Sequence, residues 1–166
     1  MPNDTMNEYQ YAERPRETQL VHQPVVICVD TSGSMEELSE DGKSSKIQIV
    51  EDMLNGLATF NIKEVDICVL AFDDKVRTIV DWRSLADFHG GLKLDTGGCT
   101  CLGSAVLESI RKTRERRRTY REDNIESKRA QIFLYTDGAS TEDLSAAYQR
   151  SQEYLNREKP SVKMYG

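Results

Sequence analysis

The chain has 166 residues, of which 30% are charged, and its formal net charge is −6 at pH 7. This length suits one domain, and the negative charge argues against a general attraction to nucleic acid or to an anionic membrane. The apolar runs VVICV and ICVLAF are far shorter than the ~20 residues of a membrane-spanning helix, and the polar N-terminus lacks the apolar segment of a signal peptide, so we expect a cytoplasmic protein.

The chain begins with an arm, a strand and a helix. Residues 1–23 have no sustained apolar period and are predicted to form a flexible arm before a single domain over residues 24–166. Pro24–Asp30 is a nearly continuous β-branched run, which is typical of a strand buried on both faces of a parallel sheet. Residues 46–61 repeat apolar side chains at spacings of three and four, which predicts an amphipathic helix.

Two further strands are predicted to be neighbours. Val65–Phe72 repeats the apolar pattern of the first strand, and residues 76–82 follow it after a short turn at Asp73 and Asp74. Because so short a connection joins antiparallel strands, the third strand is expected to lie antiparallel at an edge of the sheet. Residues 83–98 are predicted to be a loop that is rich in glycine near its end.

The remainder of the chain alternates between helix and strand. We expect a helix over residues 102–118, a strand over Gln131–Thr136, a helix over residues 141–159 with Thr141 as its N-cap, and the start of a strand over residues 161–166. This alternation predicts an α/β fold, in which a mostly parallel open sheet with one antiparallel edge strand is flanked by helices on both faces.

Polar side chains follow the predicted parallel strands. Asp30, Ser32 and Ser34 come at the end of the first strand, Asp137 follows the fourth, and Thr100 lies in a glycine-rich loop before a helix. Ligands of open α/β sheets bind at the carboxyl ends of the strands, so these five residues are expected to meet there.

The five predicted site residues all offer oxygen atoms. Such a set suits a hard divalent cation such as Mg²⁺, and Mn²⁺ or Ca²⁺ are compatible with it. Only two of the five are carboxylates, so a metal ion held by them would accept one more anionic oxygen. A carboxylate of a partner protein is the natural source of that oxygen.

Taken singly, these motifs have a simpler interpretation. D-x-S-x-S is also typical of a turn capped by its own hydroxyls, and Asp-Gly after a strand is typical of an ordinary turn. The presence of all three motifs at the expected strand ends favours the metal site.

The motifs VVICVDTSGSM, GGCTCLGSAV and IFLYTDGAST together resemble a von Willebrand factor A (VWA) domain with its metal-ion-dependent adhesion site, over residues 24–166. The resemblance implies a non-catalytic protein-interaction module whose metal ion is held by five residues. It further implies that the hydroxyls contact the metal directly while the aspartates can act through water. These residues are Asp30, Ser32, Ser34, Thr100 and Asp137.

The stretches FDDKVRTIVDWRSLADF and TGGCTCLGSAV are similar to bacterial TerY-like VWA proteins associated with tellurium resistance. This similarity implies an intracellular role in a stress response, with a kinase or phosphatase of the same system as the partner. Cys99 and Cys101 depart from the family pattern, in which small or polar residues are more usual beside the threonine. A full VWA domain also continues with a further strand and helix, which this sequence is expected to lack.

The alternative function is a Mg²⁺-dependent phosphotransferase of the haloacid-dehalogenase type with Asp30 as its nucleophile. Ser32 stands where the second acid of that family's D-x-D motif would be. A phosphate-binding P-loop is excluded because position 37 is Glu37 instead of glycine. A serine hydrolase would need His22 or His89 as its base, but His22 lies in the predicted arm and His89 is interpreted as an ordinary loop residue.

A basic run over residues 111–121 contains seven cationic side chains and one acid. It is interpreted as a solvated helix end, where cations complement the helix dipole, or as a surface for an acidic protein. Since the rest of the chain is acidic, nucleic acid is not the expected partner.

Overall fold

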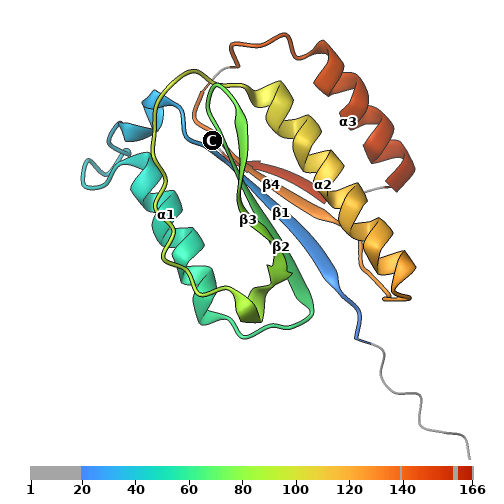
Figure 1. The fold of residues 1–166 in the computed structure, drawn as a ribbon. Helices are drawn as coiled ribbons and strands as arrows, with labels where there is room; N and C mark the ends of the chain where they lie inside the picture. Colours follow the sequence, from blue (N-terminus) through green and yellow to red (C-terminus); the bar gives the residue numbers. More distant parts are fainter. Residues whose placement is uncertain (1–19, 139, 159–160, 166) are drawn as a thin grey trace, which may run out of the picture.

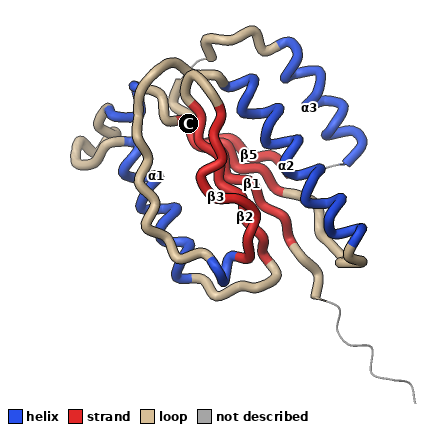
Figure 2. Tube along the Cα trace, viewed as in Figure 1, coloured by secondary structure: helices blue, strands red, loops and turns tan. Residues whose placement is uncertain are grey.

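The computed structural model describes residues 20–138, 140–158 and 161–165. Its centre is a five-stranded sheet in the order β3-β2-β1-β4-β5 (Figures 1 and 2). The β2–β3 pair is antiparallel, and the β1–β2, β1–β4 and β4–β5 pairs are parallel. The strands are β1 (Gln23–Asp30), β2 (Val65–Phe72), β3 (Val76–Ser84), β4 (Gln131–Tyr135) and β5 (Ser161–Tyr165).

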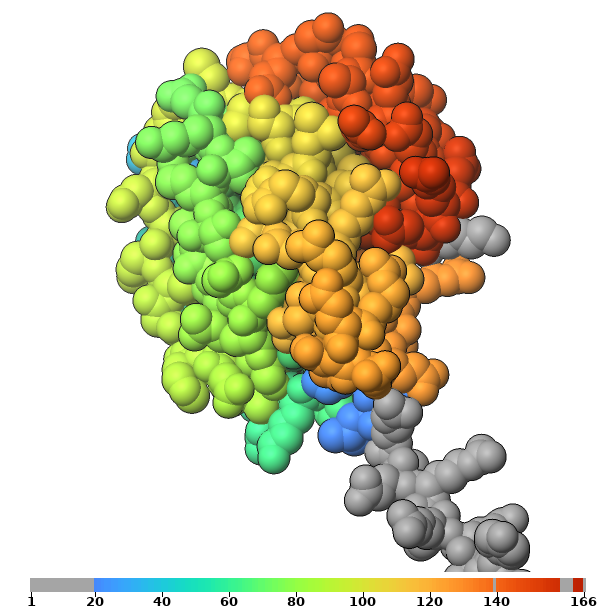
Figure 3. All heavy atoms as spheres, turned by 45° about the vertical axis from the view of Figure 1, so that its right-hand side comes forward, coloured from blue at the N-terminus to red at the C-terminus, as the bar shows by residue number. Residues whose placement is uncertain are grey.

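Helices cover both faces of the sheet. Helix α1 (Lys46–Gly56) lies on one face, and helices α2 (Leu102–Glu122) and α3 (Ser145–Glu158) lie side by side on the other (Figure 1). In Figure 3, α2 crosses the molecular surface between β3, in green, and α3, in red. The predicted fold class is therefore confirmed. No helix in the described ranges combines the length and apolarity needed to cross a bilayer.

Successive side chains of β1 point to opposite faces of the sheet and belong to two separate hydrophobic cores. Val25, Ile27 and Val29 pack with the residues of α1 on one face. Val26 and Cys28 pack with α2 and α3 on the other. Because both faces are buried, the strand reads as the continuous apolar run seen in the sequence.

The chain leaves β1 and β4 toward opposite faces of the sheet. After β1 it passes through α1 and returns to β2, and after β4 it passes through α3 and returns to β5. The carboxyl ends of β1 and β4 are thus adjacent at a topological switch point, the position where open α/β sheets bind ligands.

Several expected element boundaries were wrong. Helix α2 continues to Glu122 instead of ending at residue 118. Two residues later, Asn124 adopts a positive φ of 55°, a common conformation just past a helix end. Helix α3 begins at Ser145, so Thr141 is not its N-cap. The backbone N–H and hydroxyl of Thr141 donate instead to the Thr100 carbonyl, at 3.0 and 3.1 Å.

Other boundaries shifted by smaller amounts. Helix α1 ends at Gly56 and continues as a short 3₁₀ helix, Leu57–Thr59, instead of running to residue 61. Strand β3 extends to Ser84, and a second 3₁₀ helix, Leu85–Asp87, occupies part of the expected loop. Strand β4 ends at Tyr135, one residue earlier than expected.

Part of the expected N-terminal arm belongs to the folded domain. Strand β1 begins at Gln23, and Nδ1 of His22 lies 3.2 Å from Oδ2 of Asp66, at the amino end of β2. The rest of the predicted arm, residues 1–19, lies outside the described residues.

Candidate metal centre

The first motif turns sharply where β1 ends. Asp30 is the last residue of the strand, and its Oδ1 accepts a 2.8 Å hydrogen bond from the backbone N–H of Ser32. The turn continues into a 3₁₀ helix, Gly33–Glu36, which places Oγ of Ser34 3.2 Å from Oγ of Ser32. The motif therefore presents a carboxylate and two hydroxyls to one side.

The second motif is brought to the first by its glycines. A Cβ atom on Gly98, which has a φ of +71°, would lie 2.5 Å from Oδ2 of Asp74, so only glycine fits. The Asp74 carboxylate also accepts a 2.8 Å hydrogen bond from the backbone N–H of Cys99. The Gly98 carbonyl in turn accepts a bond from Gly33 N–H at 3.3 Å, which places Thr100 beside the first motif.

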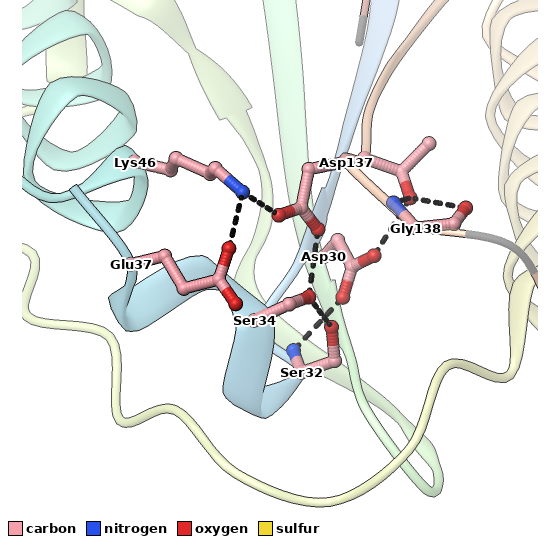
Figure 4. Close-up of polar contacts among 8 residues, drawn as sticks. Asp30, Ser32, Ser34, Glu37, Lys46, Asp137 and Gly138 are labelled. Carbon is pink, nitrogen blue, oxygen red and sulfur yellow. Dashed lines mark hydrogen bonds and ion pairs between the residues drawn. The ribbon is translucent and has the colours of Figure 1, made fainter. Parts of the chain in front are cut away.

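The third motif is tied to the first by two side-chain hydrogen bonds (Figure 4). Oγ of Ser34 donates to Oδ1 of Asp137 at 2.9 Å. Oγ1 of Thr136 donates to Oδ2 of Asp30 at 2.7 Å. Thr136 was expected to be a strand residue, and its role became visible only in the structure.

The oxygen atoms of the three motifs surround one small space. A Cβ atom built on Gly138 would lie 3.5 Å from Oγ1 of Thr100 and 4.0 Å from both Oδ2 of Asp30 and Oγ of Ser34. Ser32 and Asp137 contact Ser34, so all five predicted site residues are brought together. Glycine at position 138 leaves this space free of protein atoms.

The charges of this cluster favour a cation. The Asp30 side chain is fully buried and accepts hydrogen bonds from Ser32 and Thr136, but among the described residues it has no ion-pair partner. A buried charge is normally paired or bound to a metal. Within the described ranges no three His, Cys, Asp or Glu residues gather as a metal site. The cluster thus depends on hydroxyls, and its all-oxygen donors fit a hard divalent ion.

Lys46 contacts the cluster and was not identified from the sequence. Its Nζ lies 2.5 Å from Oδ2 of Asp137 and 3.1 Å from Oε2 of Glu37 (Figure 4). Burial tends to raise the pKa of Asp137, but the hydrogen bonds from Lys46 and Ser34 outweigh it and hold that pKa below its usual value. The bonds to Asp137 and Glu37 raise the pKa of Lys46.

The arrangement of the cluster disfavours the catalytic alternatives. Both Asp30 oxygens are engaged in hydrogen bonds, which disfavours their attack on a phosphorus atom. His22 contacts Asp66 at the opposite end of the parallel strands, and His89 is exposed on a loop. Neither histidine is placed to activate Ser32 or Ser34.

The basic run is mostly neutralised within the domain. Six of its seven cationic side chains form ion pairs, four of them with residues outside α2. The pairs join Arg111 to Glu108 and Glu115, Lys112 to Asp81, Arg114 and Arg117 to Glu158, Arg116 to Asp66, and Arg118 to Glu122. This stretch therefore holds α2 against its neighbours.

The cysteines do not crowd the oxygen cluster. Cys101 is buried in the core beneath α2, and Cys99 is exposed. All four cysteines, which also include Cys28 and Cys68, are free thiols.

Three solved structures have similar folds. The chain is 18% identical to a von Willebrand factor type A protein from Catenulispora acidiphila, with a TM-score of 0.61 over 87% of this chain and 32% of that one. For proximal thread matrix protein 1 of the mussel byssus, which has a zinc-occupied MIDAS motif, the identity is 17% and the TM-score 0.59, over 87% of this chain and 35% of that one. For the ArnB paralog VWA2 from Sulfolobus acidocaldarius, the identity is 20% and the TM-score 0.55, over 88% of this chain and 34% of that one.

The chain thus spans about a third of the length of these three proteins, and at such low identity the likeness establishes the fold. No curated protein sequence matches the chain. A sequence model of the von Willebrand factor type A domain matches residues 25–140, which include all five predicted site residues. Domains of this family are in general non-catalytic interaction modules that depend on a divalent metal. Since the match covers more than half of the chain, this protein belongs to the von Willebrand factor type A domain family.

Proposed function

We propose that this domain holds a Mg²⁺ ion at the carboxyl ends of β1 and β4 and thereby binds a carboxylate of a partner protein. The observation that carries the proposal is the space at Gly138, which is bordered by oxygens of Asp30, Ser34 and Thr100 from three separate motifs. The residues proposed to hold the ion are Asp30, Ser32, Ser34, Thr100 and Asp137.

The donor set supports the choice of metal and partner. Hydroxyl and carboxylate oxygens are the ligands of hard cations, so Mg²⁺ is the proposed ion, with Mn²⁺ and Ca²⁺ as alternatives. Zinc is a further ion to test because it occupies the motif in the mussel protein. When bound, the ion supplies a positive charge. Two carboxylates and three neutral hydroxyls leave it able to accept one more anionic oxygen, from an Asp or Glu of another protein.

The cellular setting is proposed from the resemblance to TerY-like proteins. Their similarity in the segments around β3 and Thr100 supports a cytoplasmic role in a bacterial stress response of the tellurium-resistance type. A kinase or phosphatase of the same system is the proposed partner. The phosphotransferase alternative is less favoured, because Asp30 is fully buried and both of its oxygens accept hydrogen bonds.

The metal site is tested by calorimetric titration of Mg²⁺ into wild type and Ser34→Ala. Ser34 is only partly buried, so the variant is expected to fold while its Mg²⁺ affinity falls about tenfold or more. Ser151→Ala, which removes a hydroxyl on α3, is the matched control and should bind like wild type. Equal binding by Ser34→Ala and wild type would refute the site.

The partner is tested by affinity capture with and without Mg²⁺, using Ser34→Ala as bait in parallel. A protein that is retained only by the wild-type domain with Mg²⁺, and that is lost when one of its own Asp or Glu residues becomes Asn or Gln, supports the proposal. Mg²⁺-dependent phosphate release from an aryl phosphate that Asp30→Asn abolishes would instead establish the phosphotransferase.

A further inference from the structure

A lysine ammonium occupies a position beside the proposed metal ligands. Nζ of Lys46 is 2.5 Å from Oδ2 of Asp137, whose side chain is only 14% exposed (Figure 4). The other oxygen of the same carboxylate, Oδ1, accepts the hydrogen bond from Ser34. Both oxygens of Asp137 are therefore engaged by groups of this chain.

The position of Lys46 is unfavourable for helix α1 itself. Lys46 is the first residue of the helix, directly after the N-cap Ser45, whose side chain accepts the N–H of Gln48. Cations are disfavoured at a helix N-terminus, where the dipole is positive. The carboxylates of Asp137 and Glu37 offset that cost, so the lysine is held there by the site.

Glu37 anchors the lysine independently of Asp137. Its backbone carbonyl accepts the Lys46 N–H at 3.0 Å, and its Oε2 lies 3.1 Å from Nζ. The Glu37 side chain is 69% exposed, whereas that of Lys46 is 30% exposed. An ammonium that leaves Asp137 would still have a carboxylate partner close by.

We infer that Lys46 is a resident cation that competes with the divalent ion for Asp137. It lowers the metal affinity of the site and stabilises the metal-free protein, and Glu37 receives the ammonium when the ion binds. The inference rests on the proposed function. Two charge effects support it: the lysine must give up its bond to Asp137, and any ammonium left nearby repels the ion.

The test compares Mg²⁺ titrations of wild type, Lys46→Gln, Lys46→Arg and Glu37→Gln. Lys46→Gln is expected to bind Mg²⁺ about tenfold more tightly, since one positive charge is removed beside the ion. Lys46→Arg should bind like wild type because it keeps the charge. Glu37→Gln should bind Mg²⁺ roughly threefold more weakly, because the displaced ammonium loses the carboxylate that receives it. In a protein that already carries Lys46→Gln, the Glu37→Gln substitution should not change the Mg²⁺ affinity, because no ammonium is left to receive.

A second measurement reports on the ammonium directly. The rate at which an amine-reactive reagent modifies Lys46, followed by mass spectrometry, should rise when Mg²⁺ is added. The exposed Lys43 nearby is the internal control, and its rate should not change.

The experiments distinguish failure of the competition by Lys46 from failure of the proposed metal site. If wild type binds Mg²⁺ but Lys46→Gln binds no more tightly and the modification rate of Lys46 is unchanged, the competition is refuted and the metal site stands. If neither wild type nor Lys46→Gln binds a divalent ion, the proposed function is refuted together with the inference.

Discussion

The Thr136 hydroxyl donates a 2.7 Å hydrogen bond to Oδ2 of Asp30 and joins the carboxyl ends of β4 and β1. The bond fixes a carboxylate that is fully buried, and it complements the Ser32 N–H on Oδ1. Thr136, directly after the end of β4, thus positions the acid of the first motif from within the third motif.

Replacing Thr136 with Val tests this relationship. The substitution keeps the shape of the side chain but leaves an oxygen of a buried carboxylate without its donor, which should lower the free energy of unfolding by about 1–3 kcal/mol. Urea denaturation measures the change. Thr119→Val, on the outer surface of α2, is the control, and a loss no larger than in that variant would contradict the role of Thr136.

The loop that carries Thr100 should depend on glycine at position 98. In Gly98→Ala, the new Cβ would meet the Asp74 carboxylate at 2.5 Å on a backbone with positive φ, so we expect a loss of about 1–3 kcal/mol in unfolding free energy. Gly56→Ala is the matched control. It adds a methyl group in open space at the end of α1 and should be neutral or slightly stabilising. Equal stabilities for the two variants would show that the loop is not held in this way.

Asp66 gives the protein a predictable response to acid. Burial raises its pKa, but the hydrogen bonds from Tyr120, Arg116 and His22 outweigh burial and hold that pKa below its usual value. A carboxyl group whose pKa is lower in the folded protein than in the unfolded chain stabilises the folded state at pH values above its unfolded pKa of about 4. This contribution is lost as the pH falls through the pKa of the folded state.

Asp66→Asn should therefore cost about 3 kcal/mol at pH 7 and markedly less at pH 3, as measured by urea denaturation. The exposed Asp52→Asn is the control and should change stability little at either pH. A penalty for Asp66→Asn that is the same at both pH values would contradict the ionic role of Asp66.

The sequence predicted most of the sheet and the five candidate ligands because both depend on local patterns. Strand β1 is recognisable since both of its faces are buried. Asp30 and Asp137 are recognisable since the first ends a strand of the parallel sheet and the second follows one. Their proximity then follows from the general rule for α/β folds. The role of these residues in binding a metal stays a prediction.

The features that were missed depend on long-range contacts. Lys46 meets Asp137 only because the N-terminus of α1 faces the end of β4, a relationship between residues 91 positions apart. Thr141 carries the sequence signal of an N-cap, but the Thr100 carbonyl takes its hydroxyl and the helix begins later. Tertiary contacts decided both cases.

The most direct test of the metal site is the Mg²⁺ affinity of Gly138→Ala. The added Cβ would contact Thr100, Asp30 and Ser34 at 3.5 to 4.0 Å, which the fold tolerates, but it would fill the space between their oxygens.

Gly33→Ala is the control, because its Cβ would meet only the Gly98 carbonyl at 3.9 Å. If the metal lies where we propose, calorimetry will show Gly138→Ala losing Mg²⁺ affinity about tenfold or more, with its unfolding temperature in the absence of metal close to that of wild type. Binding of Mg²⁺ by Gly138→Ala as tightly as by wild type would contradict the site.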